Sequence, residues 1–368
     1  QSVFNGIAQI CRRLDGIPFA IELAAARCRM LDPQRILLEL DDAFRILAGG
    51  STALMPRQQT LDASITWSYD LLSSTEQALL RRLSVFVDGW TLDAAEAVCP
   101  DPEGTLGTIA VFDALDRLVD HSLVHATDTE SGLRFGMLET IRQYALRQLD
   151  TDPTERDATH RRHSEHFTSW ALSHRDQILR GGSDTLLVFI DAERSNLVAA
   201  TEVATTSGEA SLAIHALAAV APVMELTSWA PMSTIFLNIL DRIEAVAEME
   251  DEWLVHQVRS ALHALRGDVM SQLGAFEDMQ RAAESADQRI GVQIARFATL
   301  TIFAAGGAPI FDELLDAVAE MEGLDPTWGA IARSHLALSA AYQGRLGLFD
   351  LVISEIDEPC FRLPPIDP

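Results

Sequence analysis

Histidines recur every three residues near the middle of the chain, at His160, His163 and His166. Imidazole nitrogens are common ligands of Zn²⁺, which usually takes four ligands in a tetrahedron. In a helix the first two of these side chains share a face and the third turns away from it. No cysteine and no clearly placed carboxylate completes the set. The spacing therefore predicts a solvated helix face rather than a metal site.

Carboxylates gather just before Trp253, at Glu248, Glu250, Asp251 and Glu252. Such a run could hold a cation, but acidic residues also favour polar loops and the first turn of a helix. We expect a polar loop or a helix end here.

Lysine is absent from the sequence, so all 28 basic residues are Arg. This excludes a P-loop lysine, a Schiff-base lysine and any catalytic lysine within these residues. The glycines at 104, 107, 181 and 182 match neither phosphate-binding pattern, G-x-x-x-x-G-K-[ST] or G-x-G-x-x-G. No serine lies in a G-x-S-x-G elbow. We therefore expect this chain to have no enzymatic activity of its own.

The charge of the chain is strongly negative, with 54 acidic residues against 28 basic ones and a net charge of -26. A surface this acidic is repelled by phosphate backbones. Its four cysteines form no Cys-x-x-Cys pair, which favours free thiols in a reducing cytoplasm. The sequence predicts no signal peptide and no transmembrane helix, and hence no membrane partner.

Hydrophobic spacing divides the chain into three predicted domains. Residues 1–50 are predicted to be helical, and Gly49-Gly50-Ser51 forms a linker. Residues 51–150 are predicted to contain helices, then a short hairpin, then a last helix. These predicted elements are helices 60–72, 76–87, 91–98 and 111–120, strands 122–126 and 133–137, and helix 139–149. This order is typical of a winged helix.

The third predicted domain, residues 151–368, is almost wholly helical. Small turn residues precede Phe276, Phe311 and Phe349, at spacings of 35 and 38 residues. A small turn residue and then an aromatic residue opening a second helix, at this period, is typical of tetratricopeptide-like (TPR-like) repeats. We expect the three rings to be buried between helices. The fold class is thus mainly α: a helical subdomain, a winged helix with a small β-hairpin, and a TPR-like α-solenoid.

Several segments resemble a known family. The segment Cys11–Arg27, with its Gly-Ile-Pro turn, resembles the Gly-Leu-Pro-Leu-Ala motif of the NB-ARC module in STAND-class signalling ATPases. Segments 56–73, 115–124 and 137–145 are similar to the winged-helix part of bacterial members of this class, and 191–200 is similar to the opening of their helical repeats. These members are often fused to LuxR-type DNA-binding or adenylyl cyclase domains.

The resemblance implies an ATP/ADP-controlled switch whose P-loop core lies before Gln1 and is absent from this chain. No nucleotide is then expected on this chain alone. In such proteins the Gly-x-Pro turn lies against the adenine, which implies a contact from Gly16, Ile17 and Pro18.

The family's Met-His-Asp motif aligns with Met137, Leu138 and Glu139. The family's histidine approaches the ADP phosphates, but Leu138 can neither donate a hydrogen bond nor carry charge. This difference argues against nucleotide sensing by the motif. Glu139 would keep a helix-capping or inter-domain role, and Met137 is more simply a core residue.

A winged helix can also bind DNA, which needs an excess of basic side chains. Residues 57–149 hold 14 acidic residues and 7 Arg. We therefore expect this domain to pack against the missing nucleotide-binding core and to make no direct contact with nucleic acid. The helical repeats are expected to sense a protein, peptide or small-molecule effector, through a groove that is acidic or has an acidic rim.

Two functional hypotheses remain open from the sequence. The first is a regulatory or sensor fragment of a STAND-class ATPase that controls transcription or signal transduction in the cytoplasm. The second is a stand-alone helical-repeat interaction scaffold with no nucleotide role. The chain opens inside a predicted helix at Gln1 and closes in a proline-rich run at 364–368, so we expect a fragment of a longer protein.

Overall fold

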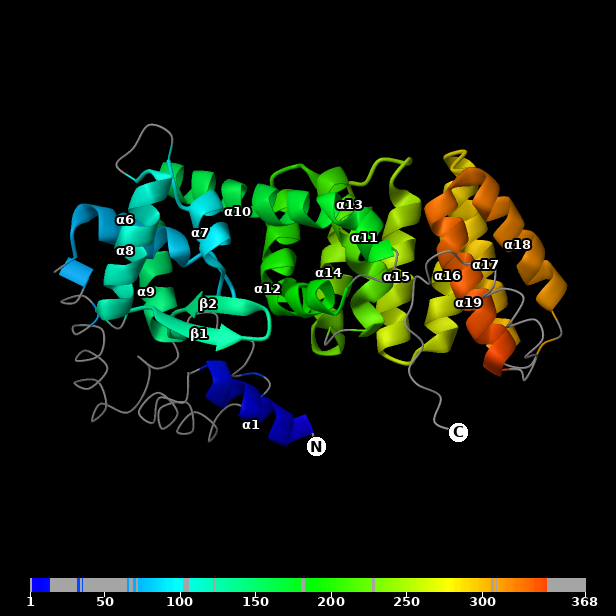
Figure 1. Ribbon diagram of the computed structural model, residues 1–368, viewed down its shortest axis with the longest axis horizontal. Helices are drawn as coiled ribbons and strands as arrows, with labels where there is room; N and C mark the ends of the chain where they lie inside the picture. Colours follow the sequence, from blue (N-terminus) through cyan, green and yellow to red (C-terminus); the bar gives the residue numbers. More distant parts are fainter. Residues whose placement is uncertain are drawn as a thin grey trace. The chain divides into compact units, whose positions relative to one another are not determined.

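The computed structural model of the chain is mainly helical and carries one small hairpin (Figure 1). The residues that the structure describes are 2–13, 32, 33, 35, 65, 69, 70, 72–101, 106–121, 123–179, 183–226, 229–305, 308 and 310–342. The chain divides into two compact units, Gln1–His163 and Ser164–Pro368. The predicted fold class is confirmed. The predicted domain boundaries at residues 50 and 150 stay predictions.

Among the described residues, the first unit contains a winged helix and, before it in the sequence, the helix α1. Its elements are α1 (Ser2–Arg13), α6 (Ser74–Leu83), α7 (Leu92–Val98), α8 (Thr108–Asp120), β1 (His125–Thr129), β2 (Gly132–Gly136), α9 (Glu139–Leu149) and the first part of α10 (Pro153–Ser173).

Local sequence signals set the starts of α6 and α7. The side chain of Ser73 accepts a hydrogen bond from the backbone of Glu76, and the Glu76 carboxylate accepts one from the backbone of Ser73. This reciprocal pair is a capping box. Thr91 caps α7 by accepting from the backbone of Ala94 at 3.2 Å. The helix predicted at 91–98 matches α7, whereas the one predicted at 76–87 begins two residues earlier, at Ser74, and ends at Leu83.

The hairpin pairs β1 with β2 in antiparallel register, with His125 opposite Gly136 and Thr129 opposite Gly132. Trp90 adds a third short stretch through two backbone hydrogen bonds with Phe135, of 2.9 and 2.8 Å. Gly89 makes this approach possible, because its φ is +98° and an added Cβ would lie 2.6 Å from the carbonyl oxygen of Phe135. The backbone of the wing is thereby anchored to the helices.

The first strand lies three residues later than the sequence predicts. We placed it at 122–126 with a polar turn at 127–132, whereas β1 covers His125–Thr129. The prediction was wrong because all five residues of β1 are exposed, so no alternation between apolar and polar residues marks the strand.

A second set of helices forms the Ser164–Pro368 unit together with the remainder of α10. These elements are α11 (Arg175–Leu179), α12 (Asp184–Thr206), α13 (Ala210–Val220), two short 3-10 turns (Ala221–Leu226 and Ala230–Met232), α14 (Ser233–Glu244), α15 (Glu252–Leu265), α16 (Val269–Ser285), α17 (Arg289–Ala305), α18 (Phe311–Leu324) and α19 (Pro326–Tyr342). Within this unit α13 contacts α15, α15 contacts α17, and α17 contacts α19, so alternate helices form one layer.

Three helix ends in this unit share one geometry. The residue after the last turn has a positive φ: 85° at Gly208, 68° at Gly267 and 54° at Asp287. In each case the next backbone N–H bonds to a carbonyl five residues earlier, as Asp268 does to His263 at 3.0 Å. This is the Schellman arrangement, which closes a helix tightly enough for the next one to pack back on it.

One predicted turn of the repeats is wrong. We placed a turn at Leu273–Gly274, but Gly274 lies inside α16 and the turn is at Gly267. Phe276 therefore lies in the middle of its helix rather than at its start.

Burial of the aromatic rings is as predicted where the structure describes them. Phe276 and Phe311 are buried in one apolar cluster, with 8% and 4% of their surface exposed, and Phe311 opens α18. Phe349 lies outside the described residues.

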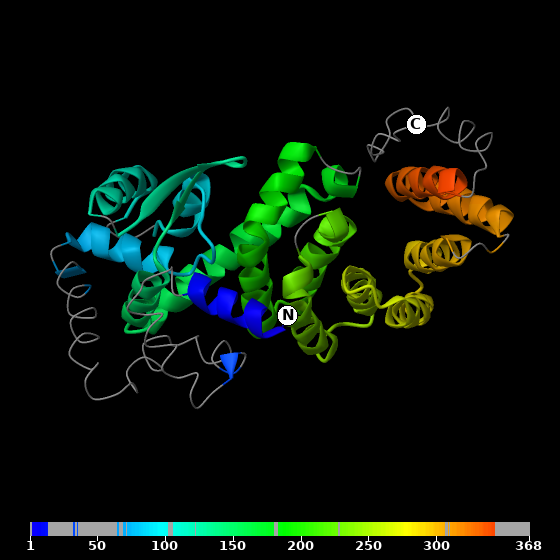
Figure 2. The ribbon, with the colours of Figure 1, turned by 90° about the horizontal axis from the view of Figure 1, so that it is seen from below.

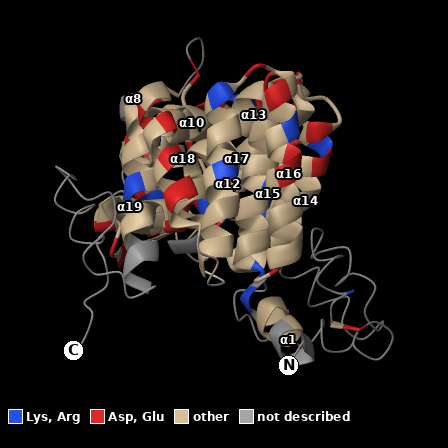
Figure 3. Ribbon diagram, turned by 90° about the vertical axis from the view of Figure 1, so that its right-hand side faces the viewer, with Lys and Arg blue, Asp and Glu red and all other residues tan. Residues whose placement is uncertain are grey.

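Acidic residues are unevenly distributed among the helices of this unit, and Figure 3 colours them red. The helices α13, α17 and α19 contain no Asp or Glu, whereas α18 contains no Arg. Ion pairs join the neighbours: Arg296 on α17 lies 3.5 Å from Glu320 on α18, and Arg333 on α19 binds Glu322. The carboxylates thus gather on α12, α14, α16 and α18. The prediction of an acidic groove stays a prediction.

Candidate functional site

Both α8 and the hairpin contribute exposed side chains to the surface of the winged helix. Figure 2 shows the hairpin ribbon reaching past α6. In a helix-turn-helix the second helix contacts the partner, and here that helix is α8, which follows α7. Its exposed side chains include Phe112, Asp113, Asp116 and Asp120, and the Phe112 residue is 55% exposed. The surface of α8 therefore combines an apolar ring with carboxylates.

The one arginine of α8, Arg117, has a side chain that is 65% exposed and makes an ion pair with α6. Nη1 of Arg117 lies 3.3 Å from Oε1 of Glu76 on α6. On the hairpin, Asp128 and Glu130 are exposed, while Arg134 is buried with 8% of its surface exposed. In DNA-binding winged helices these elements supply cations to the phosphates. Here they present carboxylates instead.

A network of arginines and carboxylates fastens α10 to the winged helix. Glu155, in the first turn of α10, accepts hydrogen bonds from Arg81 and Arg82 of α6 at 2.9 to 3.2 Å. Arg82 also binds the backbone oxygen of Cys99 and the carboxylate of Asp101, at 2.7 and 2.5 Å. The Arg82 side chain is 8% exposed and that of Glu155 is 12% exposed, so the network is shielded from water.

The predicted nucleotide-sensing residues lie where the hairpin meets α9. Met137 is half-buried, and Leu138 is 38% exposed and makes no side-chain cap on the helix. The Glu139 carboxylate accepts hydrogen bonds from Arg142 at 2.7 and 2.8 Å and from Gln143 at 2.8 Å. Glu139 thus makes contacts within its own helix. The predicted adenine contacts Gly16, Ile17 and Pro18 lie outside the described residues.

The three histidines of α10 have different surroundings. His163 is buried against the ring of Phe86, with centroids 5.2 Å apart, so the prediction of a solvated face is wrong at this position. The packing of other helices against α10 buries it, and single-helix periodicity cannot show that. His160 and His166 are half-buried, His166 lies 4.9 Å from the ring of Phe167, and burial lowers the pKa of His160. The three side chains do not meet as ligands of one ion.

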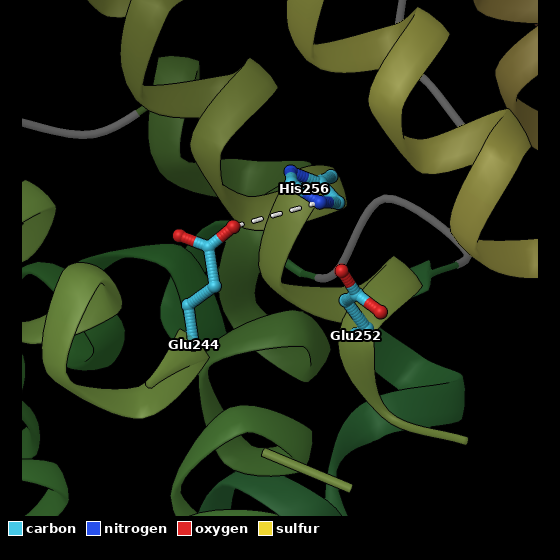
Figure 4. Close-up of side chains that lie close together, drawn as sticks. All are labelled: Glu244, Glu252 and His256. Carbon is cyan, nitrogen blue, oxygen red and sulfur yellow. Dashed lines mark ion pairs between the residues drawn. The ribbon is translucent and has the colours of Figure 1, made fainter. Parts of the chain in front are cut away.

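Another group of possible metal ligands does meet, between α14 and α15 (Figure 4). Glu244 ends α14, and Glu252 and His256 lie one turn apart at the start of α15. Their ligand atoms lie within 4.8 Å of one another, and Nε2 of His256 is 3.8 Å from Oε1 of Glu244. Arg259 holds the other oxygen of Glu244 at 2.8 Å. Spacing along one helix predicts only the Glu252–His256 pair, because Glu244 arrives from the preceding helix.

The acidic run that precedes Trp253 forms the turn into α15. Glu248 and Glu250 are exposed in that turn, and Asp251 and Glu252 begin the helix. This is the polar loop and helix start that the sequence predicts. Asp251 also lies 3.0 Å from Nε2 of His215 on α13.

Residues 72–150 match the family model of the winged helix-turn-helix domain. Two curated relatives, one from Mycobacterium bovis and one from Mycobacterium tuberculosis, each carry the name "Putative HTH-type transcriptional regulator". Each is 50% identical to this chain over 167 residues, which are 45% of this chain and 18% of the relative. A further Mycobacterium tuberculosis relative, named as an uncharacterized protein, is 41% identical over 182 residues, 48% of this chain and 43% of the relative.

The chain thus spans less than half the length of the curated relatives it matches. No solved structure matches it. Within the described residues, no helix is both long and apolar enough to cross a membrane. The winged-helix match and the names of the relatives support a regulatory role.

Proposed function

We propose that this chain is the regulatory part of a STAND-class signalling ATPase that controls transcription or signal transduction in the cytoplasm, with its P-loop core outside this chain. The winged-helix match and the relatives' names support the regulatory part of the proposal. The order of a Gly-Ile-Pro turn, a winged helix and helical repeats supports the assignment to this class.

The observation that carries the proposal is the acidic surface of α8 and the hairpin. A helix that reads DNA needs free donors for bases and phosphates. This surface offers Phe112 beside Asp113 and Asp116, and its one arginine on α8 is paired with Glu76. An exposed ring among carboxylates suits a protein surface that is basic and partly apolar. In the proposal that surface belongs to the nucleotide-binding core.

ATP or ADP is then held by the core, with Gly16, Ile17 and Pro18 lying against the adenine. We do not propose that the nucleotide phosphates contact the residues where the hairpin meets α9. Leu138 supplies no donor, and the Glu139 carboxylate would repel a phosphate. The nucleotide state would instead reach the winged helix through its packing on the core. An effector of unidentified chemistry binds the helical repeats.

The test has two parts. The reading frame before Gln1 is expected to encode a Walker A loop followed by a Walker B strand, and a frame that opens at Gln1 without them contradicts the proposal. The purified chain is expected to show no ATP turnover, because it contains no lysine and no phosphate loop. Turnover that persists through further purification would overturn that expectation.

The alternative is a stand-alone interaction scaffold with no nucleotide role. The absence of a phosphate loop from the sequence fits this alternative equally well. ADP affinity of the protein encoded by the whole reading frame separates the two: the scaffold alternative expects none.

A DNA-binding regulator is a second candidate function. The winged helix-turn-helix match and the names of the relatives favour it. The carboxylates exposed on α8 and on the hairpin argue against it. Direct measurement of DNA affinity decides between protein contact and DNA contact.

A further inference from the structure

We propose that Glu244, Glu252 and His256 bind one divalent transition-metal ion, of which Zn²⁺ is the reference. The proposal is independent of any role for nucleotide or DNA, because it rests only on the junction of α14 and α15. Figure 4 shows the imidazole edge facing Glu244, with the carboxylate of Glu252 beneath the ring.

The ligand types and their spacing suit such an ion. Imidazole nitrogen and carboxylate oxygen both bind Zn²⁺, at about 2.0–2.2 Å. Glu252 and His256 are four residues apart on α15 and therefore share a face, as do the ligand pairs of helical zinc sites. The ligand atoms now lie within 4.8 Å of one another. Bringing all three to bonding distance requires shifts of about 1 Å, well within the reach of glutamate side chains.

The edge of the imidazole that faces Glu244 makes no hydrogen bond. His256 is buried, with 6% of its surface exposed, and its Nε2 has no hydrogen-bond partner, since Glu244 is 3.8 Å away. An ion held between this nitrogen and the two carboxylates would give the nitrogen a partner.

The local charge also matches a divalent cation. Glu244 and Glu252 contribute carboxylates to the site, and Arg259 pairs with Glu244 and with the nearby Asp241. Counting these three carboxylates and the one guanidinium gives a net charge of -2. A divalent ion would neutralise this charge, which is otherwise unfavourable where water is partly excluded.

Arg259 plays a supporting part in this arrangement. Its Nη2 binds Oδ1 of Asp241 and Oε2 of Glu244, each at 2.8 Å, and so directs Oε1 of Glu244 toward the ring. Its Nη1 lies 3.4 Å from Nδ1 of His256. Metal on Nε2 requires the ring hydrogen on Nδ1, so Nη1 must rotate away. At 3.4 Å this contact is at the limit of a hydrogen bond and is weak enough to give up.

Bound metal would cross-link the last residue of α14 to the first turn of α15. The intervening turn, 245–251, would then be closed by coordination bonds as well as by helix packing. Because metal binds the folded site and not the extended chain, it should raise the stability of this unit.

The experiment measures Zn²⁺ binding to the whole chain by titration calorimetry after removal of metal with a chelator. The variants are Glu252→Gln and His256→Gln. The matched control is Glu250→Gln, which removes an exposed carboxylate from the same turn. We expect one Zn²⁺ per chain, at least tenfold weaker binding in both site variants, and unchanged binding in the control. Zn²⁺ should raise the melting temperature of the wild type and the control only.

Glu252 is half-exposed, so Glu252→Gln should fold even if the change at buried His256 impairs folding. Circular dichroism without metal checks this point. Absence of Zn²⁺ binding overturns the proposal. So does binding that Glu252→Gln leaves unchanged, or binding that Glu250→Gln weakens equally, since either result assigns the ion to scattered surface carboxylates.

Discussion

At the residue scale, Glu155 joins two arginines of α6 to the start of α10. Its carboxylate accepts hydrogen bonds from Arg81 and Arg82, and both the acceptor and Arg82 are largely shielded from water. Removing one partner from such a group leaves charge buried without compensation, and this costs more than the pair itself contributes.

We therefore predict that Glu155→Ala lowers the free energy of unfolding by about 3–5 kcal/mol. The matched control is Asp157→Ala, which removes an exposed carboxylate paired with Arg156 two residues along the same helix. That change should have little effect, because exposed pairs are screened by water. Urea denaturation followed by circular dichroism measures both. Equal stabilities of the two variants would contradict the role given to Glu155.

Cys99 is a second residue whose surroundings fix its behaviour. Burial raises the pKa of its thiol to about 12 from 9.0. The nearby guanidinium groups of Arg82 and Arg162 only partly oppose this shift. Since the thiolate is the nucleophile, the native thiol should be inert.

We predict that iodoacetamide at pH 8 modifies Cys11 well before Cys99, because Cys11 is partly exposed. Mass spectrometry of peptides measures both sites, and unfolding in urea should equalise them. The raised pKa also means that this thiol stabilises the fold fully below pH 9. That contribution then falls by about 1.4 kcal/mol per pH unit up to pH 12. Fast native modification of Cys99 would show that the site opens readily.

Residue roles that depend only on local chemistry could be predicted from the sequence. The capping pair Ser73 and Glu76 is an example, because both partners lie within one helical turn. Glu139 was expected to cap a helix or to contact another domain, and its carboxylate instead binds Arg142 and Gln143 of α9. The burial of His163 and the meeting of Glu244 with His256 could not be predicted, because both depend on which helices pack together.

At the element scale, the turns between helices carry the geometry of the second unit. Gly267 has φ of 68°, and an added Cβ would meet no atom within 4 Å. Gly274 lies inside α16 and is equally open. The two positions therefore differ in backbone conformation and not in available space.

We predict that Gly267→Ala lowers the free energy of unfolding by about 1 kcal/mol, because alanine is strained at positive φ. Gly274→Ala should raise it by about 1 kcal/mol, because alanine is the better helix former. Thermal unfolding of both variants gives the two signs. If Gly274 instead lay in a turn, as the sequence predicts, Gly274→Ala would lower the free energy of unfolding. A destabilised Gly274→Ala variant would therefore favour a turn at Gly274.

The element types could be predicted more accurately than their positions. The helix at 139–149 matches α9, since an acidic residue opens it and apolar residues recur at helical spacing. The strand β1 was misplaced because it is exposed along its whole length. The turn near Gly274 was misplaced because glycine marks turns only on average, and here an open helix surface tolerates it.

At the scale of the whole molecule, two compact units carry different surfaces. The first presents the Phe112 ring and carboxylates of α8 on its winged helix. In the second, α17 contains no Asp or Glu, whereas α18 contains no Arg. Composition predicted the overall repulsion of nucleic acid but not where the carboxylates lie. Because exposed carboxylates lie on α8 and on the hairpin, the expected repulsion of nucleic acid applies to this particular surface.

We propose that this winged helix contacts protein and not DNA. The most direct measurement is fluorescence anisotropy of labelled duplex DNA with the whole chain, over a range of salt concentrations. We predict no DNA binding above background even at low salt. The reason is that α8 and the hairpin expose carboxylates, and the arginine of α8 makes an ion pair with Glu76. Submicromolar binding that weakens steeply as salt rises, and that Phe112→Ala also weakens, would contradict it.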